Sequence, residues 1–209
     1  GLGVKLPTGN YNFKDNFYNV GPGKTEQERP VDQSIQPGDG GFGIVTEFNG
    51  YVSIDNQLSF YTNLYYLLNP RETNGTRTYR ETLSARLANE AFMSVADQYM
   101  ARFGVNCRFD KFPKNLSVAG GFRIEGIPVY DLIGKSDGFR RPGYVASFEP
   151  GLNYFVKKLN FFATVPIALI RNRTQSFTDR ENTITQGRFI NGDAAFADYS
   201  INAGFSVKF

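Results

Sequence analysis

Residues 199–209, at the C-terminal end of the chain, alternate between apolar and polar side chains without interruption. One parity carries Tyr, Ile, Ala, Phe, Val and Phe, and the other carries Ser, Asn, Gly, Ser and Lys. A period of two residues is the pattern of a β-strand with one apolar and one polar face. This segment therefore predicts a strand that ends on an aromatic residue.

The same alternation recurs upstream and divides the chain into a series of predicted strands. In each segment one parity is dominated by aliphatic and aromatic residues, and the other by polar residues, charged residues and Gly. We count about eight such segments. They are 2–6, 42–51, 58–68, 99–109, 116–125, 144–154, 159–169 and 199–209.

The connections between these segments alternate in length. The short ones are 55–56, 110–114 and 157–158, and the long ones cover about 10–40, 70–97, 129–143 and 172–197. Hairpin loops in compact soluble domains are typically about 2–5 residues long, so these long connections are unusual. Short turns at one end of the strands and long loops at the other are typical of outer-membrane β-barrels.

Two fold classes share this alternation. In a soluble β-sandwich the apolar faces pack together, whereas in a membrane barrel the apolar face contacts lipid and the polar face lines the lumen. The uninterrupted apolar parity, the loop asymmetry and the aromatic terminus favour the membrane barrel. We therefore predict an all-β single domain over residues 1–209, an antiparallel transmembrane β-barrel of about eight strands in the lipid of a bacterial outer membrane. Its long loops would lie outside and its short turns in the periplasm.

The composition removes several classes of function. The chain of 209 residues contains no His, the commonest general base and a common ligand of transition metals, and it has a single Cys. A Ser-His-Asp hydrolase, a zinc enzyme and a disulfide scaffold are thereby excluded. The net charge of +3 does not indicate a nucleic-acid partner. We expect no enzymatic activity, no metal site and no cofactor.

Charged side chains on the polar parity are the candidates for a site inside the barrel. They include Arg102, Arg123, Glu125 and Glu149. Arg123 and Glu125 lie on one predicted strand and Glu149 on the next, so an antiparallel register can bring Glu149 close to Arg123 or Glu125. Charges held away from bulk water must be paired. Such a cluster either braces the barrel interior or forms a constriction that selects solutes by charge and size. The sequence leaves both interpretations open.

One outer connection combines an aromatic residue with two adjacent cations. Phe139, Arg140 and Arg141 follow a Gly and precede the dipeptide Pro-Gly. One interpretation is a rigid turn whose Arg side chains are solvated or paired with neighbouring acids. In the other, the side chains fold inward at the mouth and select anionic or aromatic solutes.

Weaker patterns concern the loops and the membrane interfaces. Apolar residues at helical spacing predict a short helix in the second long loop, and three acidic residues of the last loop lack calcium-loop spacing and are expected to be solvated. Aromatic residues near the strand ends are expected to form two interfacial girdles, with central apolar residues facing lipid. The residues at helical spacing are Leu83, Leu87, Ala91 and Val95, and the three acidic residues are Asp179, Glu181 and Asp193. The residues expected in the girdles are Tyr51, Tyr65, Tyr66, Tyr99, Tyr144, Tyr154, Tyr199 and Phe209. The central apolar residues expected to face lipid include Val118 and Val165.

The C-terminal segment 202–209 resembles the assembly signal of bacterial outer-membrane barrels. In that signal a polar residue is followed by Gly and then by hydrophobic or aromatic residues that end in Phe, as in Gly204, Phe205, Val207 and Phe209 here. The resemblance implies recognition by the barrel-insertion machinery, which would be a partner of this chain.

The N-terminal segment Gly-Leu-Gly-Val-Lys-Leu-Pro-Thr-Gly, residues 1–9, is similar to a strand-end motif of the outer-membrane family annotated with the meta-pathway of phenol degradation. Members are regarded as transporters of small, often aromatic compounds. In that family the segment follows several earlier strands, whereas here it opens the chain. The resemblance therefore implies that N-terminal strands are missing and that the complete barrel has about twelve strands.

These observations define three hypotheses of function. The first is an outer-membrane channel or facilitator for passive uptake of small, aromatic or hydrophobic, molecules. The second is a non-conducting structural or accessory barrel subunit of an envelope complex, with other envelope proteins as partners. The third is a soluble β-barrel that binds an apolar ligand. Strand number bears on the choice, because the interior of an eight-stranded barrel is filled by side chains while larger barrels leave a channel.

Overall fold

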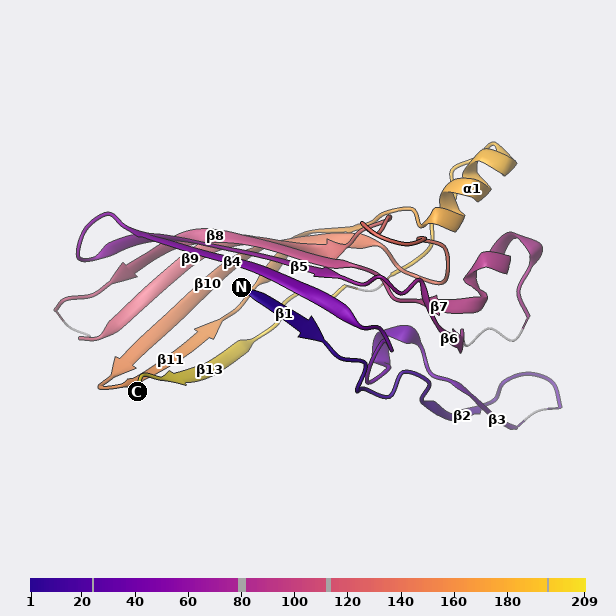
Figure 1. Cartoon of the computed structure of the whole chain (residues 1–209), viewed down its shortest axis with the longest axis horizontal. Coiled ribbons are helices and arrows are strands. Elements are labelled where there is room, and N and C mark those ends of the chain that lie inside the picture. Colours follow the sequence, from indigo (N-terminus) through magenta and orange to yellow (C-terminus); the bar gives the residue numbers. More distant parts are fainter. Residues whose placement is uncertain (24, 79–81, 112–113, 195) are drawn as a thin grey trace.

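The computed structural model describes residues 1–209 except 24, 79–81, 112–113 and 195. Over this part of the chain the fold is all-β, and one antiparallel sheet of nine strands curls into a half-barrel (Figure 1). The strand order is β1-β4-β5-β8-β9-β10-β11-β13, and β12 also pairs with β10. The strands are β1 (Leu2–Lys5), β4 (Gly43–Ser53), β5 (Leu58–Leu68), β8 (Gln98–Arg108), β9 (Leu116–Ile127), β10 (Gly143–Val156), β11 (Leu159–Thr164), β12 (Ile167–Arg173) and β13 (Asn202–Val207).

All long connections lie at one end of this sheet, which we call the loop end, and the short turns lie at the opposite turn end (Figure 1). The predicted segregation of long and short connections is thus confirmed. Among the described residues, the loop end carries two small hairpins, two 3₁₀ segments and one α-helix. These elements are β2 (Lys14–Tyr18), β3 (Glu26–Pro30), η1 (Gln33–Ile35), β6 (Thr73–Arg77), η2 (Ala85–Ala91), β7 (Phe92–Ser94) and α1 (Phe177–Gln186). None of the helices in the described residues is long and apolar enough to cross a membrane.

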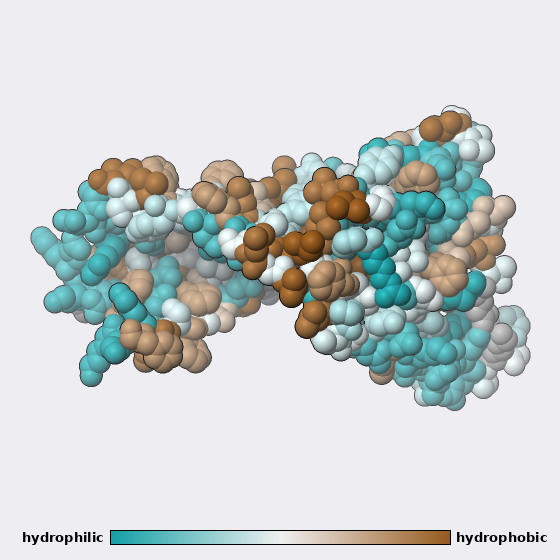
Figure 2. Space-filling model, in the orientation of Figure 1, coloured by the Kyte–Doolittle hydropathy of each residue, from teal (hydrophilic) through white to brown (hydrophobic). Residues whose placement is uncertain are grey.

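The two faces of the sheet follow the predicted parities. On the convex face Phe103, Phe122 and Phe148 stand in one row across β8, β9 and β10, with ring centroids 6.0 and 5.9 Å apart. They are 56%, 50% and 40% exposed. Figure 2 shows hydrophobic side chains gathered over the middle of the molecule in this view, with hydrophilic residues dominating the loop end. The apolar parity is therefore presented outward along the body of the sheet.

The buried hydrophobic core is small and lies at the loop end. Among the described residues it consists of Val31, Leu67, Met93, Val95 and Phe139. All five belong to the long connections or to the adjoining strand ends. The body of the sheet thus has no packed apolar layer among the described residues, in contrast to a sandwich, in which two apolar faces bury each other.

One predicted strand is divided into two. The segment 159–169 forms β11 and β12, which lie end to end along β10 and are separated by Val165 and Pro166. Pro166 has no N–H to donate to the ladder, and the register of β10 with β12 shifts between Ala146 and Ser147. Val165, expected in the middle of a lipid-facing strand, lies in this break, where its N–H donates to the Pro150 carbonyl over 3.0 Å.

The sheet is open rather than closed into the predicted ring. In the described part of the chain β1 pairs with β4 alone and β13 with β11 alone, so the two edge strands do not meet. The described strands occupy eight positions across the sheet, in line with the prediction of about eight, since β11 and β12 share one position. Half a barrel is the architecture that this chain shows.

The loop elements differ in part from expectation. Leu87 and Ala91 lie in η2, which is 3₁₀ rather than α-helical, while Leu83 precedes this segment and Val95 follows β7. The predicted helix is therefore shorter and irregular. Helix α1 was not expected at all.

Candidate functional site on the concave face

Strand register arranges the concave side chains in transverse rows. One row joins Tyr51, Tyr61, Gly104, Gly121 and Glu149 across five strands from β4 to β10. The neighbouring row toward the loop end contains Arg102 and Arg123 in directly opposed positions. Because the side-chain period of a strand is two, these rows bring residues from distant parts of the sequence onto one face.

The four charged residues predicted for the lumen form one group, which we call the Arg–Glu cluster: Arg102, Arg123, Glu125 and Glu149. Glu149 is only 1% exposed, and its two carboxylate oxygens face two cations. Its Oε1 lies 3.5 Å from Nη1 of Arg102, and its Oε2 lies 3.9 Å from Nη1 of Arg123. Arg123 also forms a close ion pair with Glu125 on its own strand.

The register thus brings Glu149 close to Arg123, one of the two neighbours expected from the sequence. It also brings Glu149 close to Arg102, which was not expected. Glu125 also pairs with Arg123, but from the other side: it lies one row closer to the loop end than Arg123, whereas Glu149 lies one row closer to the turn end. The cluster contains two cations and two anions, so its formal charge is zero. Both distances from Glu149 exceed the ~2.7–2.9 Å typical of a charge-assisted hydrogen bond, so this carboxylate is shared loosely between two guanidinium groups.

A glycine pair beside the cluster makes room for an aromatic ring. A Cβ at Gly104 or at Gly121 would lie 2.5 Å from the hydroxyl oxygen of Tyr61, which shows that the Tyr61 side chain lies across both glycines. The Arg102 guanidinium is stacked on the Tyr61 ring, with Cζ 5.4 Å from the centroid. Such cation–π contacts contribute about 0.5–2 kcal/mol. The Tyr61 ring therefore supports the Arg102 guanidinium on the concave face of the sheet.

Two cavities lie on either side of the Arg–Glu cluster. The loop-side cavity has a volume of about 650 Å³ and is lined by Arg123 and Glu125 together with Tyr65 and Phe196. The turn-side cavity has a volume of about 470 Å³, and Arg102 is on its wall. The cluster therefore separates the space along the concave face into two compartments.

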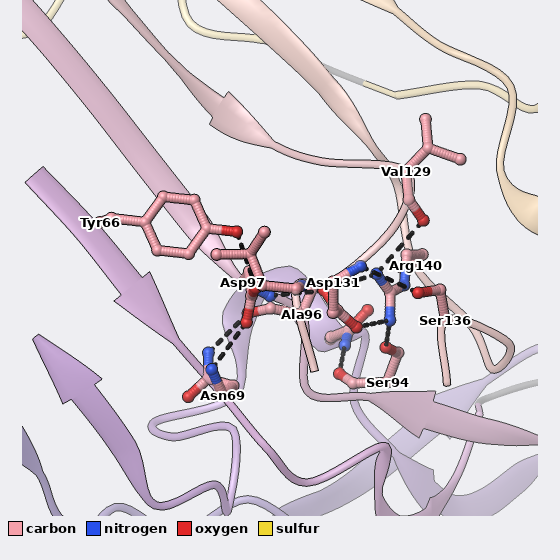
Figure 3. A network of polar contacts seen from close by, with 11 residues as sticks. Tyr66, Asn69, Ser94, Ala96, Asp97, Val129, Asp131, Ser136 and Arg140 are labelled. Atoms are coloured by element: carbon pink, nitrogen blue, oxygen red, sulfur yellow. Dashed lines mark hydrogen bonds and ion pairs between the residues drawn. The ribbon is translucent and has the colours of Figure 1, made fainter. Parts of the chain in front are cut away.

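The loop end is held by a buried polar network that we call the loop hub (Figure 3). Arg140 is 2% exposed and forms a bidentate pair with Asp131, with nitrogen–oxygen distances of 2.9 and 2.6 Å. Asp131 also accepts the N–H of Asp97 over 2.9 Å. The Asp97 carboxylate accepts from the Tyr66 hydroxyl at 2.7 Å and from the Asn69 N–H at 2.6 Å. The hub thus joins the β5–β8 connection to the β9–β10 connection.

The three loop candidates occupy different environments. Arg140 is enclosed in the hub, and Phe139 is buried beside it. Arg141 donates two hydrogen bonds, of 2.6 and 2.7 Å, to the Asp32 carboxylate, and these bonds hold the pKa of Asp32 well below its usual range. The arrangement at Arg140 and Arg141 is that of cations paired with acids from neighbouring segments. Only Arg141 of the two lines the loop-side cavity.

A further cavity of about 650 Å³ lies among the loops. Its walls include Asp32, Arg141, Arg173 and Asp179, and it shares Arg141, Ile127 and Phe196 with the loop-side cavity. The two cavities are therefore adjacent, and together they extend from the loops to the concave face of the sheet.

The C-terminal signal residues lie on and just after the edge strand. Phe205 and Val207 project outward from β13, Gly204 faces inward against the Phe162 ring, and Phe209 follows the strand and is fully exposed. The outer edge of β13 is unpaired in the described residues. An unpaired edge is what strand addition requires.

The aromatic residues that were expected to form two girdles are divided between the two faces of the sheet. Tyr66, Tyr99 and Tyr144 share one row of the outward parity near the loop end. Tyr154 belongs to an outward row near the turn end, together with Phe161 and Phe205. The other parity of β4 and β5 places Tyr51 and Tyr65 on the concave face, where each lines a cavity, and Tyr199 pairs with Ile167 near mid-sheet.

Several contributing residues were missed at the sequence level. Tyr61 and the two glycines beneath it have no local signature, because their relationship exists only through register. Helix α1 did have a signal: Ser176 and Asp179 form a capping box, and Gly187 ends the helix with a φ of 63°. Asp179 is consequently buried and paired with Arg173 at 3.3 Å, rather than solvated as expected.

No group of three or more His, Cys, Asp or Glu side chains among the described residues is arranged to hold a metal ion. Comparisons of the chain with protein-family models, with curated proteins and with solved structures give no match. The functional argument therefore depends on the fold and on the concave face.

Proposed function

We propose that this protein is a bacterial outer-membrane channel or facilitator for the passive passage of small molecules. The observation that carries the proposal is the outward exposure of the apolar parity over the sheet body, while the buried hydrophobic residues are confined to the loop end. Exposed apolar patches of this extent mark membrane or protein contact surfaces. In outer-membrane β-barrels, an outward-facing apolar band of this kind contacts the lipid of the bilayer.

The concave face supports passage rather than simple filling of the interior. Three cavities follow one another from the loops to the turn end, with the Arg–Glu cluster between the last two. Aromatic side chains line both cavities of the sheet, which suits small aromatic or hydrophobic solutes. Rings of charged side chains act as filters in pores. In this proposal the cluster is the filter.

The alternative function is that of a non-conducting barrel subunit in an envelope assembly. Two observations favour it. The Arg–Glu cluster is neutral overall and internally paired, as a brace would be. The loops are joined to one another by the hub and by the Asp32–Arg141 pair, so they present a stable surface to a partner.

Planar-bilayer recordings of the full chain and of its Arg123→Ala variant separate the two functions. If the cluster is a filter, loss of the Arg123 guanidinium widens the path and leaves Glu125 and Glu149 in excess, so conductance rises and ion preference shifts toward cations. If it is a brace, the variant loses stability and its conductance stays absent or unchanged. Arg108→Ala is the matched control, because Arg108 lies on the same strand and parity as Arg102 but outside the cluster.

The membrane assignment has its own test. Folded membrane barrels migrate differently before and after heating on a detergent gel, whereas a soluble barrel that binds an apolar ligand does not show this behaviour. A heat-modifiable band for this chain would support the channel and the structural subunit alike. Its absence, with the chain soluble without detergent, would contradict both.

A further inference from the structure

The turn-side cavity on the concave face combines aromatic walls with one charged group. Rings from four strands line it, and the remaining wall is made of neutral polar or small side chains apart from Arg102. The lining rings are Tyr51, Tyr61, Phe155 and Phe162. A volume of about 470 Å³ is within the range of small-molecule sites, which are usually apolar with a few placed polar groups.

Unused hydrogen-bonding groups gather in the wall of this cavity. Four buried polar atoms there have no hydrogen-bond partner in the part of the chain that the structure describes: Nε of Arg102, the hydroxyl of Tyr61, Oδ1 of Asn106 and Oγ of Ser117. Ser117 is itself only 1% exposed. Buried polar groups are normally satisfied, so four such atoms around one cavity indicate a polar occupant.

The charge balance at the wall determines the sign of that occupant. Within the described residues Arg102 has one ion-pair partner, Glu149 at 3.5 Å, and Glu149 also faces Arg123. The other lining residues carry no charge. Arg102 is therefore the charged group that the wall of this cavity presents to an occupant, and guanidinium groups bind carboxylates through two parallel N–H donors.

We infer that the turn-side cavity is a binding site for a small organic carboxylate. The carboxylate contacts Arg102, while the organic part lies against Tyr61 and the Phe rings. This inference rests on the proposed passage of small molecules along the concave face and specifies their chemical class. It makes Arg102 a binding residue, whereas Arg123 and Glu125 face the loop-side cavity.

Equilibrium binding of benzoate to the full chain in detergent, followed by calorimetry, tests the site. Benzamide, which has the same shape without the charge, is the neutral control. Saturable benzoate binding at least tenfold tighter than that of benzamide is expected. Equal affinities for the two compounds, or no saturable binding of benzoate at millimolar concentration, would overturn the inference.

Two variants locate the site. Arg102→Gln should weaken benzoate binding at least tenfold, and Arg171→Gln, which removes a cation that does not line this cavity, should leave it unchanged. If Arg102→Gln does not fold, Asn106→Asp provides the test, because it places a negative charge in the cavity wall without altering the Arg–Glu cluster, and it should weaken binding by a similar factor. Benzoate binding that survives the folded Arg102→Gln or Asn106→Asp variants would overturn the site.

The outcome is distinguishable from that of the channel proposal. Selective benzoate binding without conductance or uptake would support the site and contradict the channel. Conductance without selective benzoate binding would leave the channel in place and overturn the carboxylate site.

Discussion

Arg102 and Arg123 occupy directly opposed positions on β8 and β9, so two like charges stand side by side on the concave face. Like charges opposite each other on neighbouring strands are destabilising. The arrangement persists because Glu149, one row closer to the turn end, directs one oxygen to each guanidinium. The stability of the pair therefore depends on a carboxylate from a third strand.

Removal of that carboxylate should be costly. Glu149→Gln is expected to lower the free energy of unfolding by roughly 2–3 kcal/mol, less than the ~3–5 kcal/mol of a fully buried pair, since both Arg side chains keep some exposure. Glu125→Gln, at a more exposed carboxylate, should cost less than about 1 kcal/mol. Urea unfolding in detergent micelles measures both. Equal costs would mean that Glu149 does not hold the pair.

The glycine pair under Tyr61 gives a second expectation. A Cβ at Gly121 would lie 2.5 Å from the Phe103 carbonyl oxygen and from the Tyr61 hydroxyl, so Gly121→Ala should destabilise the sheet by about 1–3 kcal/mol. At the adjacent Gly120 the nearest atom, on Phe148, is 3.7 Å away, which is ordinary contact. Gly120→Ala is therefore the control and should be close to neutral. The same unfolding measurement applies.

Adjacent residues of β4 test which face contacts lipid. Phe48 is 58% exposed on the outward parity, and Asn49 lies on the concave parity at the same depth. Phe48→Arg should cost about 2–4 kcal/mol if this depth is near the bilayer midplane, and Asn49→Arg should cost little. Unfolding in lipid vesicles provides the comparison. A larger cost for Asn49→Arg would reverse the assignment of the two faces.

The Asp32–Arg141 pair predicts unusual acid resistance in the loops. Hydrogen bonds from Arg141, and then from Ser34, lower the pKa of Asp32 below that of an ordinary carboxyl group near 4. A depressed pKa contributes stability that is present above the unfolded-state pKa and is lost as the pH falls through the lower folded-state value. Protection of the loop between β1 and β4 from pepsin should therefore persist at pH 4 and disappear only at lower pH.

The corresponding variant is Asp32→Asn. It should remove the acid-dependent step and leave the loop susceptible at every pH, whereas Asp15→Asn, at an exposed position of the same loop, should behave like the wild type. Loss of protection already at pH 5 in the wild type would show that the pair does not hold this loop.

The loop hub should respond strongly to loss of one acid. Asp131→Ala leaves the buried Arg140 guanidinium without its bidentate partner, which typically costs about 3–5 kcal/mol. Asp137→Ala, in the same connection, should have little effect. Hydrogen exchange can localise the change, which we expect in the β5–β8 and β9–β10 connections rather than in the sheet body. Unchanged protection there would contradict the assigned role of the hub.

The sequence predicted the features that depend on local order. Alternation at period two placed Phe103 and Phe122 outside and Arg102 and Arg123 inside, because each strand carries its own pattern. It also located the long connections. The break at Val165 and Pro166 was missed, although proline at that point was a visible signal against a continuous strand.

Relationships between strands could not be predicted from such patterns. The opposition of Arg102 and Arg123, and the position of Tyr61 over Gly104 and Gly121, depend on register, and a shift of two residues preserves the alternation while changing every neighbour. The loop hub was equally hidden, since Asp97 and Asp131 gain their roles only when two connections meet. In a sequence, an acidic loop residue that becomes buried in such a network looks the same as one that stays solvated.

The loop hub also sets an order of events during folding. Its groups come from Tyr66 and Asn69 at the end of β5, from Asp97 before β8, and from Asp131 and Arg140 between β9 and β10. They can meet only after the hairpins that carry these strands have aligned in register. Contacts of long sequence separation form late, because the loop-closure entropy must be spent first. The interlocked loop end is thus a marker of completed assembly, and protection of the loops from protease should appear after the strands have paired.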